Sequence, residues 1–327
     1  MILAAVAAVI PAHAAETLAP VEIAEWNVPY PDSRPRDPFA VSAREVWFAG
    51  QRGHYLGRLD PETGTFFRRE LPDRPGPHNL IVGADGIVWY AGNLKGYIGR
   101  YDPRTDEIEH IPMPDPAARD PHTLVFDAGE RHIWFTLQGA NMVGRLRLSD
   151  RAVDLIHVPT LRARPYGIKI GPDGTVWVAL FGTSKLASID PETLLLTEHS
   201  LPDTGARPRR LEVLDDGQIY YVDYARGMLG HYDPQTAEVE EWAMPSGAGA
   251  RPYGMAHDAA GRIWFVETGV DPNLFVGFDP TQKKFFSITP IASGGGAVRH
   301  MHYHAPTGTV WFGTDANTIG RAQVMAP

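Results

Sequence analysis

One aromatic position recurs through the chain at nearly constant intervals. It closes a repeated segment: a proline, a polar or aromatic residue, an apolar strand, a turn with Gly or Asp, and the aromatic residue itself. Successive copies lie 42 to 47 residues apart and contain Trp47, Trp89, Trp134, Trp177, Tyr220, Trp264 and Trp311. A period of roughly 40–50 residues with a recurrent Trp strand is typical of four-stranded propeller blades. These copies predict an all-β, seven-bladed β-propeller with antiparallel blades.

The two ends of the chain fit this prediction. The last unit, from Arg299 to Val324, contains three strand-like segments and lacks a fourth, whereas residues 21–29 read like an isolated fourth strand. We therefore expect the N-terminal strand to complete the last blade and close the ring, which leaves only short blade edges exposed. A closed ring cannot be divided, so residues 15–327 are predicted to form one domain. A pair of β-sandwiches would not produce an even repeat along the whole chain.

The composition excludes several kinds of function. Lys and Arg number 30 against 39 Asp and Glu, a net charge of −9, which argues against general binding of nucleic acid. The chain has no cysteine, so disulfides, thiolate nucleophiles and cysteine-based metal sites are excluded. No long apolar run follows residues 1–10, so we expect no membrane insertion. We also expect a monomer.

The first fourteen residues resemble a secretory signal peptide. Residues 1–10 are apolar but too few to span a bilayer, and Ala12 and Ala14 supply a small-residue cleavage site. Residues 1–14 are therefore predicted to be a signal peptide, and the protein to be periplasmic or secreted. A disordered, Ala-rich tail is the alternative.

The repeat also predicts what lines the central channel. The loop into each innermost strand lies at the channel, so equivalent residues of all blades face one another there. The residue after the repeated proline, or its equivalent, is Phe39, His78, His122, Tyr166, Arg209, Tyr253 and His300. The His, Tyr and Arg side chains among them can serve as general bases, general acids and anion ligands. The predicted catalytic residues are His300, Tyr253, His122, His78 and Tyr166; the alternative is that they line a wet channel.

Arginines gather around the same prolines. The predicted substrate-binding residues are Arg36, Arg164, Arg209, Arg251 and Arg299. A local arginine cluster on a net-acidic protein favours an anionic ligand, such as a small or oligomeric carboxylate, sulfate or uronate. Local pairing with acids such as Asp37 and Asp120 is the alternative.

The metal signals are weak. Asp223 and Glu267 occupy the same position of adjacent blades, three residues after the aromatic residue, but hard cations need more than two oxygen ligands. His300, His302 and His304 alternate and so share one strand face, yet each step spans roughly 6–7 Å, which is wide for one ion. The metal is left unassigned.

The repeat as a whole resembles the streptogramin B lyase (virginiamycin B lyase) family over about residues 21–324. The resembling segments are Pro121-His122, Pro165-Tyr166-Gly167-Ile168, Pro172-Asp173-Gly174, Trp264-Phe265-Val266-Glu267 and Ile319-Gly320-Arg321. The resemblance implies the seven-bladed fold and the opening of cyclic depsipeptide antibiotics by elimination. It also implies a His base in the last blade, a second His one blade earlier, and Mg²⁺ held near two Glu.

The implied site residues are only partly present. The last-blade base falls on His300, and the second His position holds Tyr253. The two Glu positions hold Val298 and Thr314, so the expected Mg²⁺ carboxylates are not kept and the cofactor is left open. The sequence looks like a divergent member of the family.

Two main classes of function, and a third possibility, follow from these observations. Elimination needs a base for the proton α to a carbonyl, a group that stabilises the enolate, and an acid for the leaving oxygen. A secreted or periplasmic lyase acting at an ester or ether linkage would use His300 as the base. Arg251, Arg299 or Arg209 would stabilise the enolate, and Tyr253, Tyr166 or His122 would be the acid. The alternative is a non-catalytic propeller that binds an anionic ligand or assembles with partners; a hydrolase such as a lactonase is a third possibility.

Overall fold

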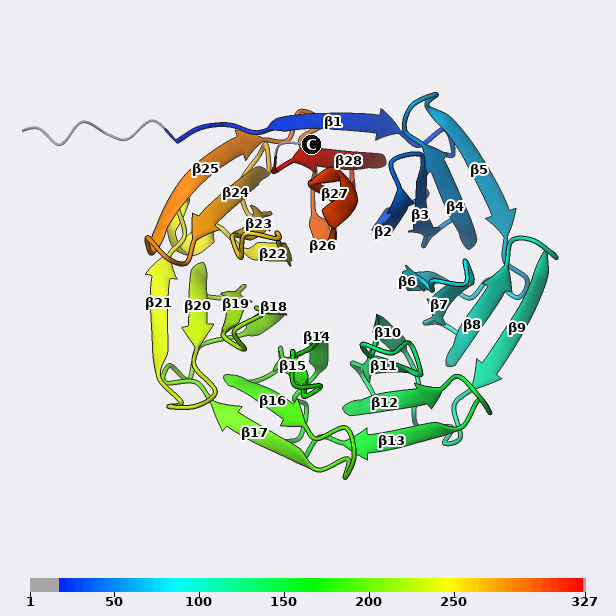
Figure 1. Cartoon of the computed structure of the whole chain (residues 1–327), viewed down its shortest axis with the longest axis horizontal. Coiled ribbons are helices and arrows are strands. Elements are labelled where there is room, and N and C mark those ends of the chain that lie inside the picture. Colours follow the sequence, from blue (N-terminus) through cyan, green and yellow to red (C-terminus); the bar gives the residue numbers. More distant parts are fainter. Residues whose placement is uncertain (1–17, 326–327) are drawn as a thin grey trace, which may run out of the picture.

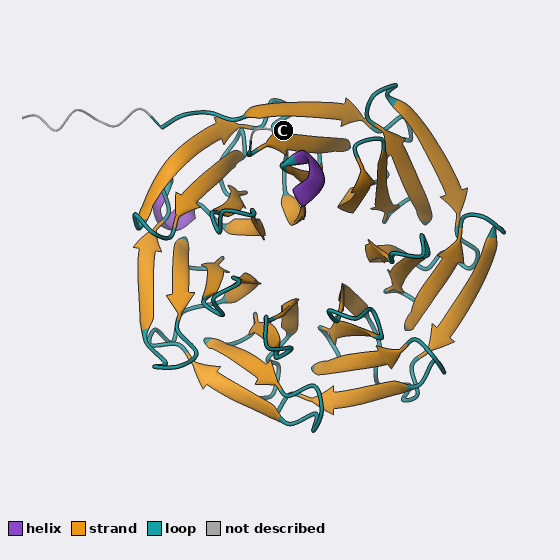
Figure 2. Cartoon of the chain, in the orientation of Figure 1, coloured by secondary structure: helices purple, strands orange, loops and turns teal. Residues whose placement is uncertain are grey.

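The computed structural model describes residues 18–325, so the predicted signal peptide at residues 1–14 lies outside the described chain. In residues 18–325, the strands form seven four-stranded antiparallel sheets set around one axis (Figure 1). Figure 2 shows that helix is confined to two short turns, η1 (Gly247–Gly249) and η2 (Ala305–Thr307). No helix in this part of the chain is long and apolar enough to cross a membrane. The predicted seven-bladed, all-β propeller is confirmed.

The strands are ordered from the channel outward in each blade. The innermost strands are β2 (Pro35–Ser42), β6 (Pro77–Val82), β10 (Pro121–Phe126), β14 (Pro165–Ile170), β18 (Pro208–Val213), β22 (Pro252–His257) and β26 (Val298–His304). The second strands are β3 (Glu45–Gly50), β7 (Val88–Gly92), β11 (His132–Leu137), β15 (Val176–Leu180), β19 (Ile219–Asp223), β23 (Ile263–Glu267) and β27 (Thr309–Thr314). The third strands are β4 (Tyr55–Asp60), β8 (Tyr97–Asp102), β12 (Met142–Arg147), β16 (Lys185–Ile189), β20 (Met228–Tyr232), β24 (Leu274–Asp279) and β28 (Thr318–Gln323). The outer strands are β5 (Thr65–Glu70), β9 (Glu107–Pro112), β13 (Val153–His157), β17 (Leu196–Ser200), β21 (Val239–Ala243), β25 (Lys284–Pro290) and β1 (Glu22–Asn27).

The sequence pattern of each strand follows from its place in the blade. Second strands lie between two other strands and two neighbouring blades, so their central residues are mainly apolar; β7 is buried at every residue. Outer strands have one wet face, and β21 mixes Glu with Trp242 at half-buried positions. The turns between first and second strands use Gly at positive φ, as at Gly86 (79°) and Gly174 (85°).

The recurrent aromatic residue joins neighbouring blades. Trp47 of the first blade packs in one buried cluster with Leu80 and Val82 of the second blade. Trp311 of the last blade packs with Ala40 and Val46 of the first blade. The recurrent aromatic residue has the same role in every blade, because each copy packs between its own sheet and the next one.

The N-terminal strand closes the ring as predicted. In the last blade, β1 pairs with β28 from Glu22 opposite Gln323 to Asn27 opposite Thr318, and Figure 1 shows β1 at the outer edge of this sheet. The indole of Trp26 stacks on Trp311, with ring centroids 5.7 Å apart. Segments nearly 300 residues apart thus form one sheet.

A glycine in the third strand of most blades makes room for the aromatic ring of the second strand. A Cβ added to Gly144 would overlap with the ring of Phe135, which lies opposite it in the ladder. We expect Gly144→Ala to lower the free energy of unfolding by about 1–3 kcal/mol, because the blade interior would be overpacked. Chemical denaturation checks this. Gly249→Ala, where an added Cβ meets nothing within 4 Å, is the matched control and should change stability by no more than about 0.5 kcal/mol.

Candidate active site in the central channel

The strand register identifies which residues are equivalent at the channel. The first residue of each innermost strand lies opposite the last residue of its second strand, as for Pro77 and Gly92 or Val298 and Thr314. The next residue in each strand faces the channel, and we call these seven the channel ring: Arg36, His78, His122, Tyr166, Arg209, Tyr253 and Arg299.

This register corrects the predicted alignment in two blades. In the first blade the equivalent proline is Pro35 rather than Pro38, so Arg36 and not Phe39 lies in the channel ring. In the last blade Val298 takes the place of the proline, so Arg299 and not His300 is the ring residue. The prediction was right for the other five blades, where a single proline marks the start of the innermost strand.

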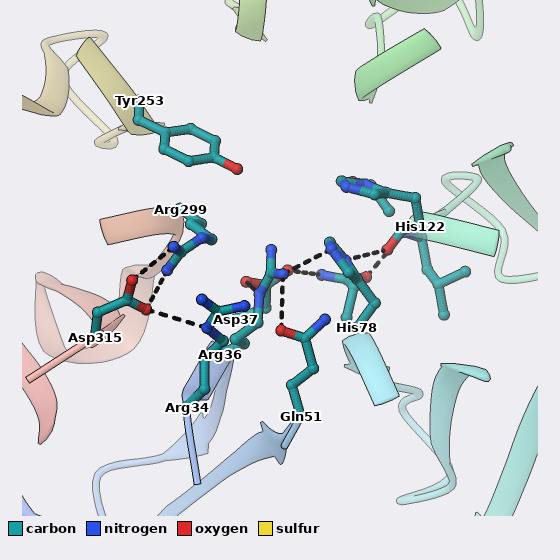
Figure 3. A network of polar contacts seen from close by, with 12 residues as sticks. Arg34, Arg36, Asp37, Gln51, His78, His122, Tyr253, Arg299 and Asp315 are labelled. Carbon is teal, nitrogen blue, oxygen red and sulfur yellow. Dashed lines mark hydrogen bonds and ion pairs between the residues drawn. The ribbon is translucent and has the colours of Figure 1, made fainter. Parts of the chain in front are cut away.

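One side of the channel ring is a chain of hydrogen bonds through two histidines. Nη1 of Arg36 donates to Nε2 of His78 at 2.6 Å, and Nδ1 of His78 donates to the carbonyl oxygen of His122 at 3.2 Å (Figure 3). The two imidazole centroids lie 3.7 Å apart. Burial, and then the charge of nearby arginines, lowers the pKa of both histidines well below the ordinary value. Both rings are therefore neutral.

The other side of the channel ring is a tyrosine pair beside an arginine. The hydroxyls of Tyr166 and Tyr253 are in direct hydrogen-bond contact, although the residues come from blades that are not adjacent. The guanidinium carbon of Arg209 lies 3.6 Å from the ring centroid of Tyr253, and its Nη2 lies 3.5 Å from the Tyr166 hydroxyl. Phe181 and Tyr224 also flank this guanidinium, at 4.6 and 4.3 Å from their ring centroids.

The arginines give the two phenols different proton affinities. Burial opposes ionisation of Tyr166, but Arg209, Arg210 and Arg36 outweigh it and lower the pKa of Tyr166 to about 8. Burial and the neighbouring Tyr166 raise the pKa of Tyr253 above the ordinary value. The pair therefore loses its first proton near pH 8 and then holds one proton between two oxygens.

A second layer lies one residue further along each strand and is polar in five of the blades, where it holds Asp37, Asn79, Thr123, Arg210 and His300. Arg210 spans the channel: its Nε donates to the carbonyl oxygen of Arg299, and its Nη1 donates to Oγ1 of Thr123, both at 3.0 Å. The Asn79 amide donates to Asp37 at 2.9 Å. The sequence analysis missed Asn79, Thr123 and Arg210, although a repeat alignment continued one position further would have found them.

Several buried guanidinium nitrogens have no acceptor. Among the residues described, the buried side-chain nitrogens without a hydrogen bond include Nε and Nη2 of Arg36, Nε of Arg209 and Nη2 of Arg210. Nε of Arg36 lies 3.5 Å from Asp37, so this arginine has the local ion pair that was the alternative to ligand binding. In the same range, neither Arg209 nor Arg210 forms an ion pair with a carboxylate. Unpaired buried cations are costly. Free donors that converge from two adjoining layers of a channel are an arrangement that can bind an anion.

The remaining predicted arginines lie nearer the surface. Figure 3 shows Arg299 and Arg34 converging on Asp315; Arg299 forms a two-pronged ion pair with it, and Nε of Arg34 lies 3.5 Å from it. Arg164 and Arg251 are exposed, one residue before the prolines of their strands. These two can meet a ligand at the channel entrance but are not part of the buried layer.

The two carboxylates suggested for a metal have structural partners instead. Asp223 is fully buried and accepts from Nε of Arg226 at 2.6 Å and from the backbone N–H of Arg207 at 3.0 Å. Glu267 accepts from Ser246, and burial raises its pKa.

The residues at the family's Mg²⁺ positions do not fit that ion. Val298 and Thr314 offer no carboxylate, and the Thr314 hydroxyl hydrogen-bonds to that of Thr318 at 2.8 Å. In residues 18–325, no three His, Asp or Glu side chains cluster as metal ligands would. Val298 and Thr314 therefore do not form a Mg²⁺ site.

His300 follows the ring residue Arg299 and lies in the second layer, close enough to Arg210 and His122 to interact with them electrostatically. From this layer it also lines the cavity that extends toward the other end of the channel, together with Lys169, Glu212 and His302. Burial and Arg210 lower its pKa well below the ordinary value. Of its neighbours in sequence, His302 stacks on Phe39 with centroids 4.1 Å apart, and His304 hydrogen-bonds to Thr307.

The fold and the site together define a seven-bladed propeller whose channel carries an arginine-rich layer with histidines and a tyrosine pair. The sequence model of the virginiamycin B lyase family matches residues 13–270 and, in a second alignment, residues 152–326. The chain belongs to the virginiamycin B lyase family. A search of curated protein sequences found no significant match.

Solved structures share the fold at low sequence identity. A streptogramin B lyase is 22% identical with a TM-score of 0.81, and the match covers 93% of this chain and 98% of that one. A catalytically inactive His-to-Ala variant of virginiamycin B lyase from Staphylococcus aureus with quinupristin is also 22% identical, with a TM-score of 0.83 and 93% and 99% coverage. The extracellular domain of a B. thetaiotaomicron protein described as a hybrid two-component system is 15% identical, with a TM-score of 0.71 and 94% and 44% coverage.

The tyrosine pair should be visible by titration. We expect the near-ultraviolet absorbance of the folded protein to show one tyrosinate forming near pH 8, since the arginines lower the pKa of Tyr166 to about that value. Tyr166→Phe should abolish this transition. Tyr220→Phe is the control, because burial raises the pKa of Tyr220 to about 12 and its loss should leave the transition near pH 8 in place. A first tyrosine transition at the ordinary pKa in the parent protein would contradict the assignment.

Proposed function

We propose that this protein is a carbon–oxygen lyase that eliminates across a bond β to a carboxylate, on a small or oligomeric anionic substrate bound at the channel ring. The observation that carries the proposal is the contact of Tyr166 and Tyr253 beside Arg209. This group places a phenol that ionises easily, a phenol that keeps its proton, and a cation at one point. Elimination requires a base for the α proton, an acid for the leaving oxygen and a group, here a cation, that stabilises the negative charge of the enolate.

Each group has one task in this reaction. The Tyr166 oxygen takes the proton α to the carboxylate, and the electron pair left on carbon forms the new C=C bond as the C–O bond breaks. The Tyr253 hydroxyl protonates the departing oxygen. Arg209 and Arg36, whose free nitrogens are buried at this level, hold the carboxylate and the charge that develops on it. The direct contact of the two hydroxyls lets a proton return from Tyr166 to Tyr253 after each turnover.

This assignment differs from the expectation that His300 is the base. His300 lies one residue beyond the ring and lines the cavity beyond it, burial and Arg210 keep its imidazole neutral, and the last-blade ring position holds Arg299. An arginine cannot act as a general base, because its guanidinium stays protonated. A streptogramin B depsipeptide is therefore not the substrate that this site favours, and an oligouronate, with a β-oxygen leaving group and a carboxylate in each sugar, fits it better.

Turnover can be measured by mass spectrometry with an oligouronate as the probe. Elimination conserves the summed mass of the products and creates an absorbing C=C bond, whereas hydrolysis adds one water. We expect Tyr166→Phe to lower kcat/KM by about 10²–10⁴-fold, the usual contribution of a general base, and Tyr220→Phe to leave it unchanged. Below pH 8, kcat/KM should fall about tenfold per unit, since Tyr166, with its pKa near 8, must be ionised.

The same assay separates the alternatives. Loss of turnover in His300→Ala with full activity in Tyr166→Phe would transfer the role of base to His300. Conversion of a streptogramin B depsipeptide at constant mass would assign antibiotic cleavage instead. Product heavier by one water would identify a hydrolase.

A non-catalytic anion-binding propeller is the second candidate. The burial of the tyrosine pair favours it, because Tyr166 and Tyr253 are each only 3% exposed and a substrate must reach their hydroxyls. Saturable binding of the oligouronate without any product, weakened at least about tenfold by Arg209→Gln, would support this candidate over the lyase.

We also propose that the protein is exported to the periplasm or secreted. The apolar residues 1–10 and the small residues that follow support export, and one structural relative is an extracellular domain. Expressed from its full sequence in a bacterium, the protein should be recovered from the periplasm or medium with a mass that lacks residues 1–14. Recovery of the full-length chain from the cytoplasm would contradict export.

A further inference from the structure

The channel has a second end, and its lining differs from the channel ring. The fifth residue of each innermost strand faces the channel three residues beyond the ring, which is roughly 10 Å further along the axis. These residues are Phe39, Ile81, Val125, Lys169, Glu212, Ala256 and His302. All of them line one cavity of about 380 Å³. This volume lies within the range of roughly 300–1,000 Å³ that small-molecule sites occupy.

The cavity has an apolar side and a polar side. Phe39, Ile81 and Val125, from the first three blades, lie with Phe126 on the apolar side. On the polar side, Lys169 and Glu212 form an ion pair at 2.9 Å. His300 and His302 of the last blade also line the cavity.

The polar side is electrically balanced. Glu212 is buried, and Lys169 and His257 lower its pKa against the effect of burial, so it is ionised and matched by the lysine. Nδ1 of His257 donates to its other oxygen at 2.9 Å. Burial lowers the pKa of His302 to about 3 and that of His300 well below the ordinary value, so both are neutral. A charged ligand would bring an uncompensated charge into this cavity, which is unfavourable.

One polar group in the lining lacks a partner. Nδ1 of His300 is buried and has no hydrogen bond among the residues described. The His300 side chain itself is only partly buried and lines the cavity. A neutral imidazole has one donor and one acceptor nitrogen, so rotation of the ring about its Cβ–Cγ bond would present one nitrogen to a single hydroxyl on a ligand. Beside it, His302 stacked on Phe39 presents a flat wall, with 24° between the ring planes.

From this geometry we propose that the second end of the channel is a separate binding site for a neutral, mainly apolar molecule with one hydroxyl, of the size and shape of a simple phenol. Its aromatic body packs against Phe39, Ile81 and Val125, and its hydroxyl bonds to His300. The channel ring and this cavity therefore select opposite kinds of ligand, an anion at one end and an uncharged amphiphile at the other. The proposal does not depend on the lyase chemistry.

Binding of p-cresol to the full-length protein, measured by calorimetric titration, tests the site. Toluene and benzoate are the comparison probes: toluene lacks the hydroxyl, and benzoate carries a charge. We expect p-cresol to bind saturably, toluene more weakly, and benzoate not in this cavity. Val125→Phe fills the apolar side and should weaken p-cresol at least about tenfold, whereas Val41→Phe, at a position 42% exposed outside the cavity, should not.

A second variant separates the hydrogen bond from the shape of the cavity. His300→Ala should weaken p-cresol about three- to tenfold, the net effect of one hydrogen bond, and leave toluene unweakened. Absence of saturable p-cresol binding, or binding that survives Val125→Phe in a folded variant, would overturn the site. Equal weakening of p-cresol and toluene by His300→Ala would overturn the role of His300, and benzoate displacing p-cresol with similar affinity would overturn the selection of neutral ligands.

Discussion

The pairing of β1 with β28 closes the ring, and the geometry of the channel depends on that closure. Without it, the last blade would end at β28, and the first and last blades would meet without the Trp26–Trp311 stack. Once the ring is closed, equivalent residues of seven strands surround one axis at the same height. Each position along the innermost strands therefore forms a ring of seven side chains around the channel. The chemical character of the channel at each height depends on the residues in that ring.

Two of these rings differ in their charge: one is rich in arginine, and the other is electrically balanced. At the channel ring and the layer beneath it, Arg36, Arg209 and Arg210 leave buried nitrogens without acceptors. Three residues further along, Lys169 and Glu212 neutralise each other and the histidines are uncharged. Because Arg210 spans the channel from Thr123 to the carbonyl of Arg299, it lies between the two regions. The channel therefore has two regions of different charge, separated by a polar layer.

The fold was predictable because the repeat encodes it, and the channel ring was predictable where one proline marks the strand start. The first blade has Pro35 and Pro38, and the last has Val298, so the sequence pattern pointed to Phe39 and His300 where the register has Arg36 and Arg299. The contact of Tyr166 with Tyr253 depends on how far side chains reach across the axis. A local sequence pattern does not predict contacts across the axis. The role of Arg210 was missed for the same reason, because its side chain also reaches across the channel.

The arginines act in opposite directions on the histidines and the tyrosines of the channel. A histidine in this layer cannot hold a proton, because burial and neighbouring guanidinium groups favour the neutral ring, as at His78 and His122. The same positive surroundings act in the opposite direction on a phenol, because its ionised form is an anion. They lower the pKa of Tyr166 to about 8. An arginine-rich channel therefore favours tyrosine over histidine as the group that loses a proton near pH 8.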